Sequence, residues 1–466
     1  MPLVLSGNVG SATAATGFNV ANSVRFDTNA YMHKTPGSAG SLTTWTFSTW
    51  IKRAKLGSSQ YIFTSRNDGN NSTWAYFDSN DKILFFDIDG NADQGKLITN
   101  RLFRDVGAWM HLAFIWNTTS GTAGDRIQLW VNGVRETSFS TQTNPDQNDA
   151  STMGDAHIIE VGRGGEDENY ANFYMAETVY QNNSAASPVD VFGEFDSDSG
   201  IFKPIDVSGL TFGTNGFYLD FEASGNLGND ANGGTDLTEV NLAATDQSTD
   251  TCTNNFATMN PLDNFYNAAT FSEGNCQVVT TASPSSYNTS TIGVSSGKWY
   301  FEVEVESFST DNDRALVGIS STQTSANYLG QNAHDWALTN QGDLYNNNEE
   351  EDGSYGSTWS AGDIIGVALN LDDNELKFYY NGAVENSGTA ISITAAASTP
   401  LGAYFAAAGD FSGSGSHLLT TKWNFGASYP AAISSGNTDA NGHGNFEYTV
   451  PSGHFAICTK NLAENS

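Results

Sequence analysis

The chain has 466 residues, and 38% of them are hydrophobic, which is enough to build cores. Because one core seldom serves more than about 250–300 residues, this length predicts two domains. The 52 acidic and 19 basic residues give a formal net charge of −33. Such a surface repels phosphate groups, which disfavours binding to nucleic acids and to anionic membranes. It favours solubility in a salty medium and can collect divalent cations.

Two local features bear on the compartment. The three cysteines, Cys252, Cys276 and Cys458, have the spacing of neither a disulfide framework nor a zinc site, so we expect reduced, mostly buried thiols. Residues 1–20 lack the pattern of a secretory signal, and no apolar run is long enough to span a bilayer. We therefore expect assembly in a cytoplasm, without membrane insertion. After an apolar start at Pro2–Leu5, residues 1–20 are small and polar, which predicts an arm, either loose or docked on a neighbour.

Strand signals follow steadily from residue 21 to residue 222. Runs such as TWTFSTWIKR (44–53) and AWMHLAFIWN (108–117) are rich in aromatic and β-branched residues and are bounded by Gly, Asn, Asp or Pro. This pattern is typical of strands buried on one or both faces. Long segments with a helical period are absent. One short helix is predicted at SPVDVFGEF (187–195), where a serine cap precedes a proline.

Residues 223–275 are polar and rich in Gly, Asn, Asp and Thr. We interpret them as a connector that packs in part on one domain. Strand signals then resume, for example in GKWYFEVEVES (297–307) and ELKFYYNG (375–382). The sequence therefore predicts an all-β chain with two tandem antiparallel β-sandwich domains, at residues 21–222 and 276–466.

Two Asn-Gly pairs close strands of similar composition, in LWVNGV (129–134) and FYYNGA (378–383). Asn-Gly between strands favours a type I′ hairpin turn, because both central residues need a positive φ. A tryptophan precedes each asparagine at almost the same distance, Trp109 by 23 residues and Trp359 by 22. We infer one supersecondary unit that is used in both sandwiches.

The order of several motifs resembles two known families. The first half resembles laminin-G/concanavalin A-like sandwiches, in the form found in virion proteins of marine bacteriophages, through SVRFDTNAYMHKTPGSAGSLTTWTFSTWIKR, RDVGAWMHLAFIWNTT and DRIQLWVNG. The connectors FGEFDSDSGIFKP, GTNGFYLDF and TNNFATMNPLD are similar to those of the same phage proteins. The second half resembles a SPRY domain through GKWYFEVEV, VGIS, GDIIGVALNLDDNELKFYYNG and WNFG, and the end, GNFEYTVPSGHFAICTKNL, resembles its phage version.

This resemblance implies two concanavalin A-like, jelly-roll sandwiches in a virion structural protein, exposed in a tail fibre, an appendage or a capsid decoration. Its implied partners are other virion proteins and further copies of the chain, with a trimer among the candidate homo-oligomers. We interpret the chain as a recognition and adhesion module and not as an enzyme. Two alternatives stay open: a receptor-binding tip for a host-surface glycan, and a polysaccharide-degrading glycoside hydrolase.

The hydrolase alternative depends on Glu302, Glu304 and Glu306, which alternate in FEVEVES and so share one strand face. Neighbouring carboxylates there lie roughly 6–7 Å apart, whereas retaining glycosidases hold two carboxyls at about 5–5.5 Å. The run is similar to the catalytic strand of some concanavalin-like glucanases. We favour a plain amphipathic strand with the glutamates in water, and we assign no catalytic residue.

A candidate calcium site lies in DIDGNAD, where Asp87, Asp89, Asn91 and Asp93 alternate around a glycine turn. Calcium takes six to eight hard oxygen ligands, and this spacing can supply several of them. The run departs from an EF-hand loop, because Ala92 stands where that loop needs glycine. We favour an exposed acidic hairpin; a structural calcium ion is the alternative and the only cofactor that we consider.

The acidic loop NNNEEEDGSYGS (346–357) is the other candidate site. A solvated loop is the default interpretation of such a run. Partners of SPRY-like modules bind the loops between strands, so Trp336, Tyr345 and Tyr355 are candidate ligand-binding residues; tryptophan and tyrosine supply rigid contact area. The competing interpretation is that Trp336 and Trp359 belong to the core.

Overall fold

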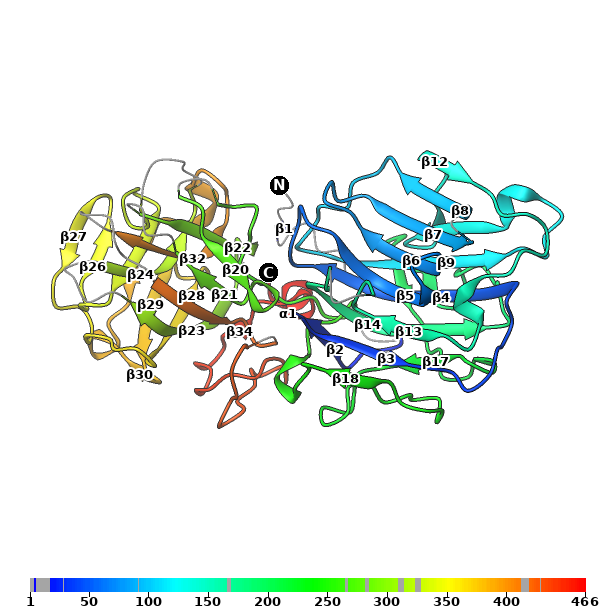
Figure 1. Ribbon diagram of the computed structural model, residues 1–466. Coiled ribbons are helices and arrows are strands. Elements are labelled where there is room, and N and C mark those ends of the chain that lie inside the picture. The colour runs from blue at the N-terminus through cyan, green and yellow to red at the C-terminus, as the bar shows by residue number, and fades with distance from the viewer. Residues whose placement is uncertain are drawn as a thin grey trace. The chain divides into compact units, whose positions relative to one another are not determined.

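The computed structural model describes residues 4–5, 17–27, 29–90, 92–165, 169–264, 267–280, 285–308, 314–322, 328–411, 419–427 and 429–466. The chain is nearly all-β and divides into two compact units. Ala15–Thr253 forms the first sandwich, and Asn254–Ser466 together with Met1–Ala14 forms the second. Each sandwich consists of two packed, mostly antiparallel sheets (Figure 1). The predicted all-β class and the two sandwiches are confirmed.

One sheet of the first sandwich, called the β4 sheet, has the strand order β11-β10-β9-β4-β14-β2-β19, with β17 paired to β14. The strands are β2 (Ser23–Phe26), β4 (Thr44–Arg53), β9 (Trp109–Asn117), β10 (Ile127–Val131), β11 (Val134–Arg135), β14 (Phe173–Asn182), β17 (Phe217–Leu219) and β19 (Gln247–Ser248). A separate hairpin contains β15 (Gly193–Phe195) and β16 (Phe202–Pro204).

The opposite sheet, called the β6 sheet, has the order β12-β8-β7-β6-β5-β13-β3-β18. Its strands are β3 (Tyr31–Lys34), β5 (Gln60–Asp68), β6 (Asn71–Phe77), β7 (Ile83–Asp89), β8 (Ala92–Thr99), β12 (Phe139–Thr143), β13 (Ile158–Val161) and β18 (Thr238–Val240). Aromatic side chains of both sheets fill the space between them. Phe47 stacks on Phe63 at 4.3 Å, and Trp45 stacks on Trp116 at 6.4 Å.

The second sandwich pairs a β24 sheet, ordered β1-β22-β32-β24-β25-β26-β27, with a β23 sheet, ordered β20-β21-β33-β23-β28-β29-β30. In the β23 sheet, β31 also pairs with β29, and β34 with β23. The first sheet contains β1 (Val4–Leu5), β22 (Tyr287–Val294), β24 (Arg314–Ser320), β25 (Asp335–Thr339), β26 (Leu344–Asn346), β27 (Glu349–Asp352) and β32 (Tyr404–Phe411). The second contains β20 (Thr270–Ser272), β21 (Gln277–Val279), β23 (Lys298–Phe308), β28 (Ile364–Asn370), β29 (Glu375–Tyr380), β30 (Ala383–Val384), β31 (Ile391–Ser392), β33 (Leu419–Asn424) and β34 (Phe455–Ala456).

Helical structure is sparse in the described parts of the chain. The short helix expected at residues 187–195 is a turn, in which the N–H groups of Val191 and Phe192 donate to the carbonyl of Pro188. Asp190 has a φ of 64°, which a helix does not allow. No helix in these parts is long and apolar enough to cross a membrane. The helices are α1 (Thr459–Asn465) and the single 3₁₀ turns η2 (Ala123–Asp125), η3 (Thr152–Gly154), η4 (Ala244–Asp246), η5 (Glu273–Asn275), η6 (Asn386–Gly388) and η7 (Ala396–Ser398).

The predicted arm and connector both take part in the sandwiches. Strand β1 pairs in parallel with Ile292 and Gly293 of β22, so this part of the arm adds an edge strand to the second sandwich. The connector expected at residues 223–275 is divided at Thr253 between the two units. Its first part supplies β18 and β19 to the first sandwich, and its last part supplies β20 to the second.

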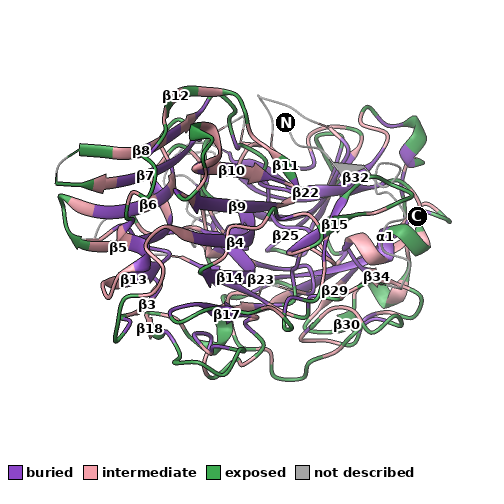
Figure 2. Cartoon of the chain, turned by 90° about the vertical axis from the view of Figure 1, so that its right-hand side faces the viewer, coloured by how far each residue is buried: buried purple, intermediate pink, exposed green. Residues whose placement is uncertain are grey.

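Parts of residues 187–212 and 250–252 cover the outer face of the β4 sheet, where Phe192, Val207 and Phe212 pack with Val179. Phe202 stacks on Trp50 at 6.0 Å. Lys52 Nζ lies 2.7 Å from Asp250 Oδ2, and the side chains of both residues are at most 1% exposed. Trp109 Nε1 donates to the other oxygen of Asp250 at 2.9 Å. Figure 2 accordingly shows β4 and β9 as buried strands.

The two Asn-Gly hairpins have the same hydrogen bonds. The side-chain oxygen of Asn132 accepts from the N–H of His111 at 2.7 Å, and that of Asn381 accepts from the N–H of Ile364 at 2.9 Å. Each asparagine N–H donates back to the carbonyl of the same partner at 2.9 Å. All four turn residues have a positive φ, from 46° to 80°. One hairpin design therefore occurs in both sandwiches.

The matched tryptophan spacing, in contrast, is a coincidence. The hydrogen-bonded partners are 21 residues apart in the first hairpin and 17 in the second, so the two loops differ in length. Trp109 lies on the outer face of its sheet, where it donates to Asp250. Trp359 is 2% exposed and lies in the core of the second sandwich. The two tryptophans are therefore not structural counterparts.

Candidate binding surfaces

The first glutamate of the FEVEVES strand is buried, and both oxygens of its carboxylate accept hydrogen bonds from the same sandwich. Glu302 is 2% exposed. Its carboxylate accepts the backbone N–H groups of Glu447 and Tyr448, both at 2.9 Å. It also accepts the hydroxyl of Tyr300 at 3.1 Å and the amide of Asn424 at 3.3 Å. Burial raises the pKa of Glu302 above its usual range, although these four donors oppose the shift.

The next two glutamates also hold neighbouring segments. Glu304 accepts the hydroxyl of Tyr429 and lies 3.4 Å from Lys422 Nζ. Glu306 pairs with the same lysine at 3.1 Å and accepts from Gln277 at 2.7 Å. The expected alternation is present, because Val303 and Val305 between them are core residues. The expectation that all the glutamates point into water is wrong for Glu302, which anchors the segment around Tyr448.

In the first sandwich, a serine and a histidine form a buried pair on the outer face of the β4 sheet. Ser48 Oγ lies 2.8 Å from His111 Nε2, and neither residue is more than 1% exposed. Burial lowers the pKa of His111 to about 3, so its ring is neutral near pH 7. Phe202 packs on this ring with centroids 5.2 Å apart. The pair lies below the covering segment, out of reach of a substrate.

The candidate calcium ligands do not converge in the described residues. Asp87 is fully buried and faces the core, where Oδ2 accepts the hydroxyls of Thr73 at 2.6 Å and Ser151 at 2.8 Å. Burial raises the pKa of Asp87 to about 7, because desolvation penalises the charged carboxylate. The prediction of Asp87 as a ligand on an exposed hairpin is therefore wrong.

Of the other candidates, Asp89 is the last residue of β7, and Asp93 lies in β8. Asp89 is exposed, and Asp93 forms an ion pair with Lys96 at 3.0 Å. Asn91 is outside the described residues. Across the ranges that the structure describes, no group of three or more His, Cys, Asp or Glu side chains is placed to hold a metal ion.

The predicted contact residues of the second sandwich separate into core and surface. Tyr355 is 3% exposed and packs edge-on against Phe378 at 6.1 Å, so its assignment to a surface patch is wrong. Trp336 is half-buried and packs against the same core. Tyr345 keeps a partly exposed ring, and its hydroxyl donates to Glu350 at 2.9 Å. Trp336 and Tyr345 are both partly exposed and both pack in part on a buried cluster, so they stay predictions, and only Tyr355 is excluded from a contact surface.

A different surface stands out on the β6 sheet of the first sandwich. Alternation turns Phe85 and Phe77 into the core, and their neighbours along β6 and β7 point outward. The outward set on β5 to β8 is unusually aromatic for a sheet face that is not covered. We call it the aromatic face; it consists of Tyr61, Trp74, Tyr76, Leu84, Phe86, Lys96 and Ile98.

The aromatic face has two rows that cross the strands. In the first row, Tyr61 and Tyr76 are directly paired, and their rings stack at 4.5 Å with planes 8° apart. The same row continues through Leu84 to Ile98.

In the second row, Trp74 pairs with Phe86 at 6.4 Å, and Lys96 follows, with Nζ 4.5 Å from the centre of the Phe86 ring. Leu84 is 7% and Phe86 9% exposed, and the other members of the face have more surface accessible. Figure 2 shows intermediate and exposed parts along β5 to β8, in contrast to β4 and β9.

The sequence contains a signal for this face, which is absent from the predicted site residues. NSTWAYF in β6 and ILFFDID in β7 place large apolar residues at consecutive positions, so both faces of each strand are apolar. Such a run is also typical of a strand that is buried on both faces. The sequence alone does not show that only one of the two faces is covered.

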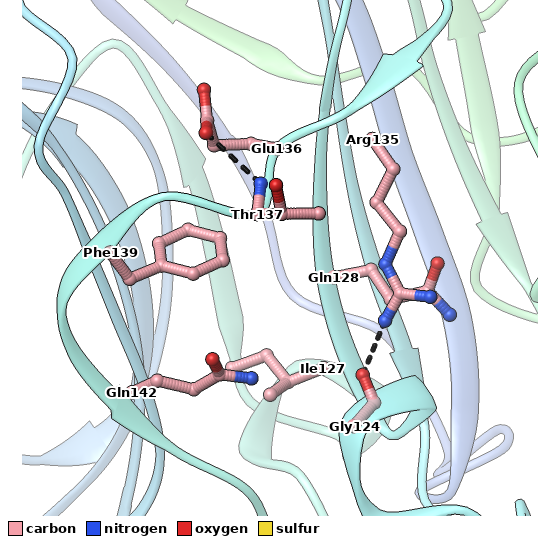
Figure 3. Close-up of a pocket in the computed structure, with 8 residues that line it drawn as sticks. All are labelled: Gly124, Ile127, Gln128, Arg135, Glu136, Thr137, Phe139 and Gln142. Carbon is pink, nitrogen blue, oxygen red and sulfur yellow. Dashed lines mark hydrogen bonds between the residues drawn. The ribbon is translucent and has the colours of Figure 1, made fainter.

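A small cavity of about 190 Å³ lies where the edge strand β12 approaches β10 and β11. In Figure 3, Phe139 and Gln142 line one side of it, and Gln128 and Arg135 line the other. Arg135 is already paired, because it donates to Asp125 at 2.7 Å and to the carbonyl of Gly124. The cavity therefore offers amide and aromatic groups but no unpaired cation. Its remaining lining residues are Ile127, Glu136 and Thr137.

Comparison with known proteins agrees with the two sandwiches. Residues 26–185 match the model of the concanavalin A-like lectin/glucanases superfamily, and residues 298–420 match the SPRY domain. The SPRY domain of human HERC1 is 18% identical, with 35% of this chain and 96% of that chain covered and a TM-score of 0.29. The heptameric SAP-like pentraxin from Limulus polyphemus is 13% identical, with 37% and 81% covered and a TM-score of 0.27. A human SPRY domain is 18% identical, with 34% and 92% covered and a TM-score of 0.23.

Proposed function

We propose that the chain is a non-catalytic recognition protein on the surface of a phage particle, in a tail fibre, an appendage or a capsid decoration. The chain carries a concanavalin A-like domain and a SPRY domain, two types of module that typically bind rather than catalyse. The motif order of the whole chain, which resembles marine phage virion proteins, supports the placement on a particle.

One observation carries the recognition role: the aromatic face stays partly exposed. Soluble proteins rarely expose large contiguous apolar patches. An apolar patch that stays accessible therefore indicates a binding site. The outer face of the β4 sheet in the same sandwich is covered by other parts of the unit, among them the β15–β16 hairpin, in which Phe202 is buried, and the segment of Asp250, which is also buried. The aromatic face has no such cover in the described residues, which supports its use for a partner.

The hydrolase alternative has less support from the geometry. Glu302 is the most buried of the three strand glutamates, and its oxygens bind backbone and side-chain donors of its own sandwich. A glycosidase needs two carboxyls that face a substrate. Glu304 and Glu306 share Lys422, which further supports a structural role for this strand.

The proposal is tested with the free chain and the phage that carries it. Antibodies against the chain should label intact virions, and excess free chain, added to host cells first, should reduce phage adsorption severalfold. A labelled capsid without an effect on adsorption would indicate a decoration protein with no receptor role. Virions that do not bind the antibody, together with unchanged adsorption, would contradict the proposal. Light scattering of the free chain tests the expected homo-oligomer.

A further inference from the structure

We infer that Lys52 and Asp250 condense to an amide, an isopeptide bond that crosslinks the first sandwich covalently. Lys52 Nζ lies 2.7 Å from Asp250 Oδ2, and the ion pair in the structure is the state from which the bond forms. Three properties favour the bond over a plain ion pair: the geometry of the two groups, their burial and their place in the chain. Its formation depends on this buried pair alone and not on the proposed function.

The geometry of the pair suits attack of the amine on the carboxyl carbon. An amine nitrogen in contact with one carboxyl oxygen lies about 3–3.5 Å from the carbon, which is the separation of a near-attack arrangement. The other oxygen, Asp250 Oδ1, accepts from Trp109 Nε1 at 2.9 Å. This donor withdraws electron density from the carboxyl group, and it stabilises the negative charge that develops on Oδ1 during the attack.

Burial converts the two charged groups into reactive neutral ones. The side chain of Lys52 is 1% exposed and that of Asp250 is 0% exposed. Charges without hydration are costly, which favours transfer of the ammonium proton to the carboxylate. The ring of Tyr174 lies 5.8 Å from Lys52 Nζ, and Trp109 packs in one apolar cluster with Trp50. Because such a site excludes water, hydrolysis of the finished amide is disfavoured.

The reaction needs no oxidant, reductant or other co-reactant. After the proton has moved to Asp250 Oδ2, the lone pair of Lys52 Nζ forms a bond to the carboxyl carbon, and the electrons of the C=O bond move onto Oδ1. The protonated Oδ2 then leaves this carbon and takes a proton from the nitrogen, while the C=O bond forms again. One water molecule is released, and one amide N–H remains.

The pair lies where the chain leaves the first sandwich. This unit ends at Thr253, three residues after Asp250. The last strand of the unit, β19, pairs with β2 over two residues. Lys52, in contrast, lies on β4, which is held between β9 and β14 in the middle of its sheet. A force that pulls on the end of this unit would therefore act on a central strand through a covalent bond, and not on a two-residue strand alone.

The experiment is mass spectrometry of the purified full chain. The intact mass should be lower than the sequence mass by one water molecule. A tryptic digest should contain a branched peptide that joins the segments around Lys52 and Asp250, and trypsin should not cut after Lys52, because its amine is acylated. Lys422 is the internal control: it pairs with Glu304 and Glu306 but is 15% exposed, so its amine should stay free.

Lys52→Arg is the matched control variant, because arginine keeps the charge but does not form this amide. It should have its full mass and should move more slowly in a denaturing gel than the looped parent. It should also unfold at a lower temperature, because it lacks the crosslink that restricts the unfolded parent. If Lys52→Arg does not fold, the double variant Lys52→Met/Asp250→Leu, which buries no charge, takes its place.

Trp109→Phe tests the role of the indole N–H. The variant keeps an aromatic ring but has no donor for Asp250 Oδ1, so it should fold and condense severalfold more slowly. The measurement is the fraction of chain that still has its full mass at fixed times after cell-free synthesis. Equal rates in the parent and in Trp109→Phe would contradict the role given to the indole.

The masses decide between the bond and a plain ion pair. A branched peptide that is present in the parent and absent from Lys52→Arg would establish the bond. A parent with its full mass and no branched peptide would overturn the inference. A loss of water that persists in Lys52→Arg would overturn it as well, because a succinimide at an Asp-Gly pair such as Asp89-Gly90 also releases water but leaves Lys52 free.

Discussion

In each sandwich a segment of chain covers the outer face of one sheet: the β4 sheet in the first, and in the second the β23 sheet, which is covered by the segment that contains Phe446, Glu447 and Tyr448. The two segments are held in different ways. In the first sandwich, Phe202 packs on Trp50, and a buried ion pair joins Lys52 to Asp250. In the second, Phe446 packs edge-on against Tyr300 at 5.3 Å, and the carboxylate of Glu302 binds two backbone N–H groups of the segment. An aromatic contact provides burial in both, while the fixed position comes from a charge pair in one case and from backbone hydrogen bonds in the other.

In each sandwich the Asn-Gly hairpin contacts the covering segment. The glycine of each turn lies directly under an aromatic ring of the covering segment: Gly133 under Phe202, and Gly382 under Tyr448. A side chain at either position would collide with that ring. The glycine thus serves the turn through its φ and serves the covering segment through its lack of a Cβ.

The largest effect is expected from Asp250→Ala. The substitution removes the ion-pair partner of the buried Lys52 and the acceptor of the indole N–H of Trp109, which should cost the first sandwich about 3–5 kcal/mol of unfolding free energy. Differential scanning calorimetry, with the second sandwich as internal reference, measures the loss. The double variant Lys52→Met/Asp250→Leu should lose less than Asp250→Ala, because it leaves no unpaired charge; a larger loss in the double variant would contradict this explanation.

A somewhat smaller effect, about 3 kcal/mol, is expected from Glu302→Ala in the second sandwich. The substitution leaves the N–H groups of Glu447 and Tyr448 without an acceptor. Urea unfolding measures the stability, and limited proteolysis should cut the covering segment sooner than in the parent. Glu306→Gln is the matched control, because this glutamate is only partly buried on the same strand face, and the glutamine keeps an oxygen that can accept from Gln277; it should change stability by less than about 0.5 kcal/mol. Equal losses in the two variants would show that Glu302 has no special role.

The smallest effects are expected from Gly133→Ala and Gly382→Ala. The added Cβ would lie 2.5 Å from a ring carbon of Phe202 or of Tyr448, and φ is 71° and 80°. Each variant should lose about 1–2 kcal/mol in thermal unfolding, part of it from the unfavourable φ. Gly57→Ala separates the two causes, since Gly57 has a φ of 71° and no atom within 4 Å of the added carbon. If the three variants lose the same free energy of unfolding, the aromatic rings do not constrain the turns.

The sequence was sufficient to predict the elements whose partners are close along the chain. The two sandwiches, the Asn132 and Asn381 turns and the alternation of Val303 and Val305 follow from local pattern, because turn chemistry and burial period are properties of a few neighbouring residues. The arm was predicted as a segment, but its pairing with β22 was left open, because a short apolar run does not specify which edge it joins.

The candidate site residues were harder to predict, because long-range packing decides their roles. Tyr355 looks like a loop residue in the sequence but reaches the core beside Phe378. Asp87 belongs to an acidic run, yet it follows Phe85 on the core-facing side of its strand. The aromatic face is the reverse case. Its sequence is typical of core residues, but they stay accessible because no covering segment lies over them in the described residues.

The pairing of β1 with β22 has a consequence for how the chain matures. In terms of connectivity, the first sandwich is an insertion between the first strand of the second sandwich and all the others. During synthesis, Val4 cannot pair until Ile292 has been made. The β24 sheet is therefore completed late, through a contact of very high sequence separation. A fragment that starts at Asn254 would present the backbone of Ile292 and Gly293 as an open sheet edge, a template for aggregation that β1 covers in the longer chain.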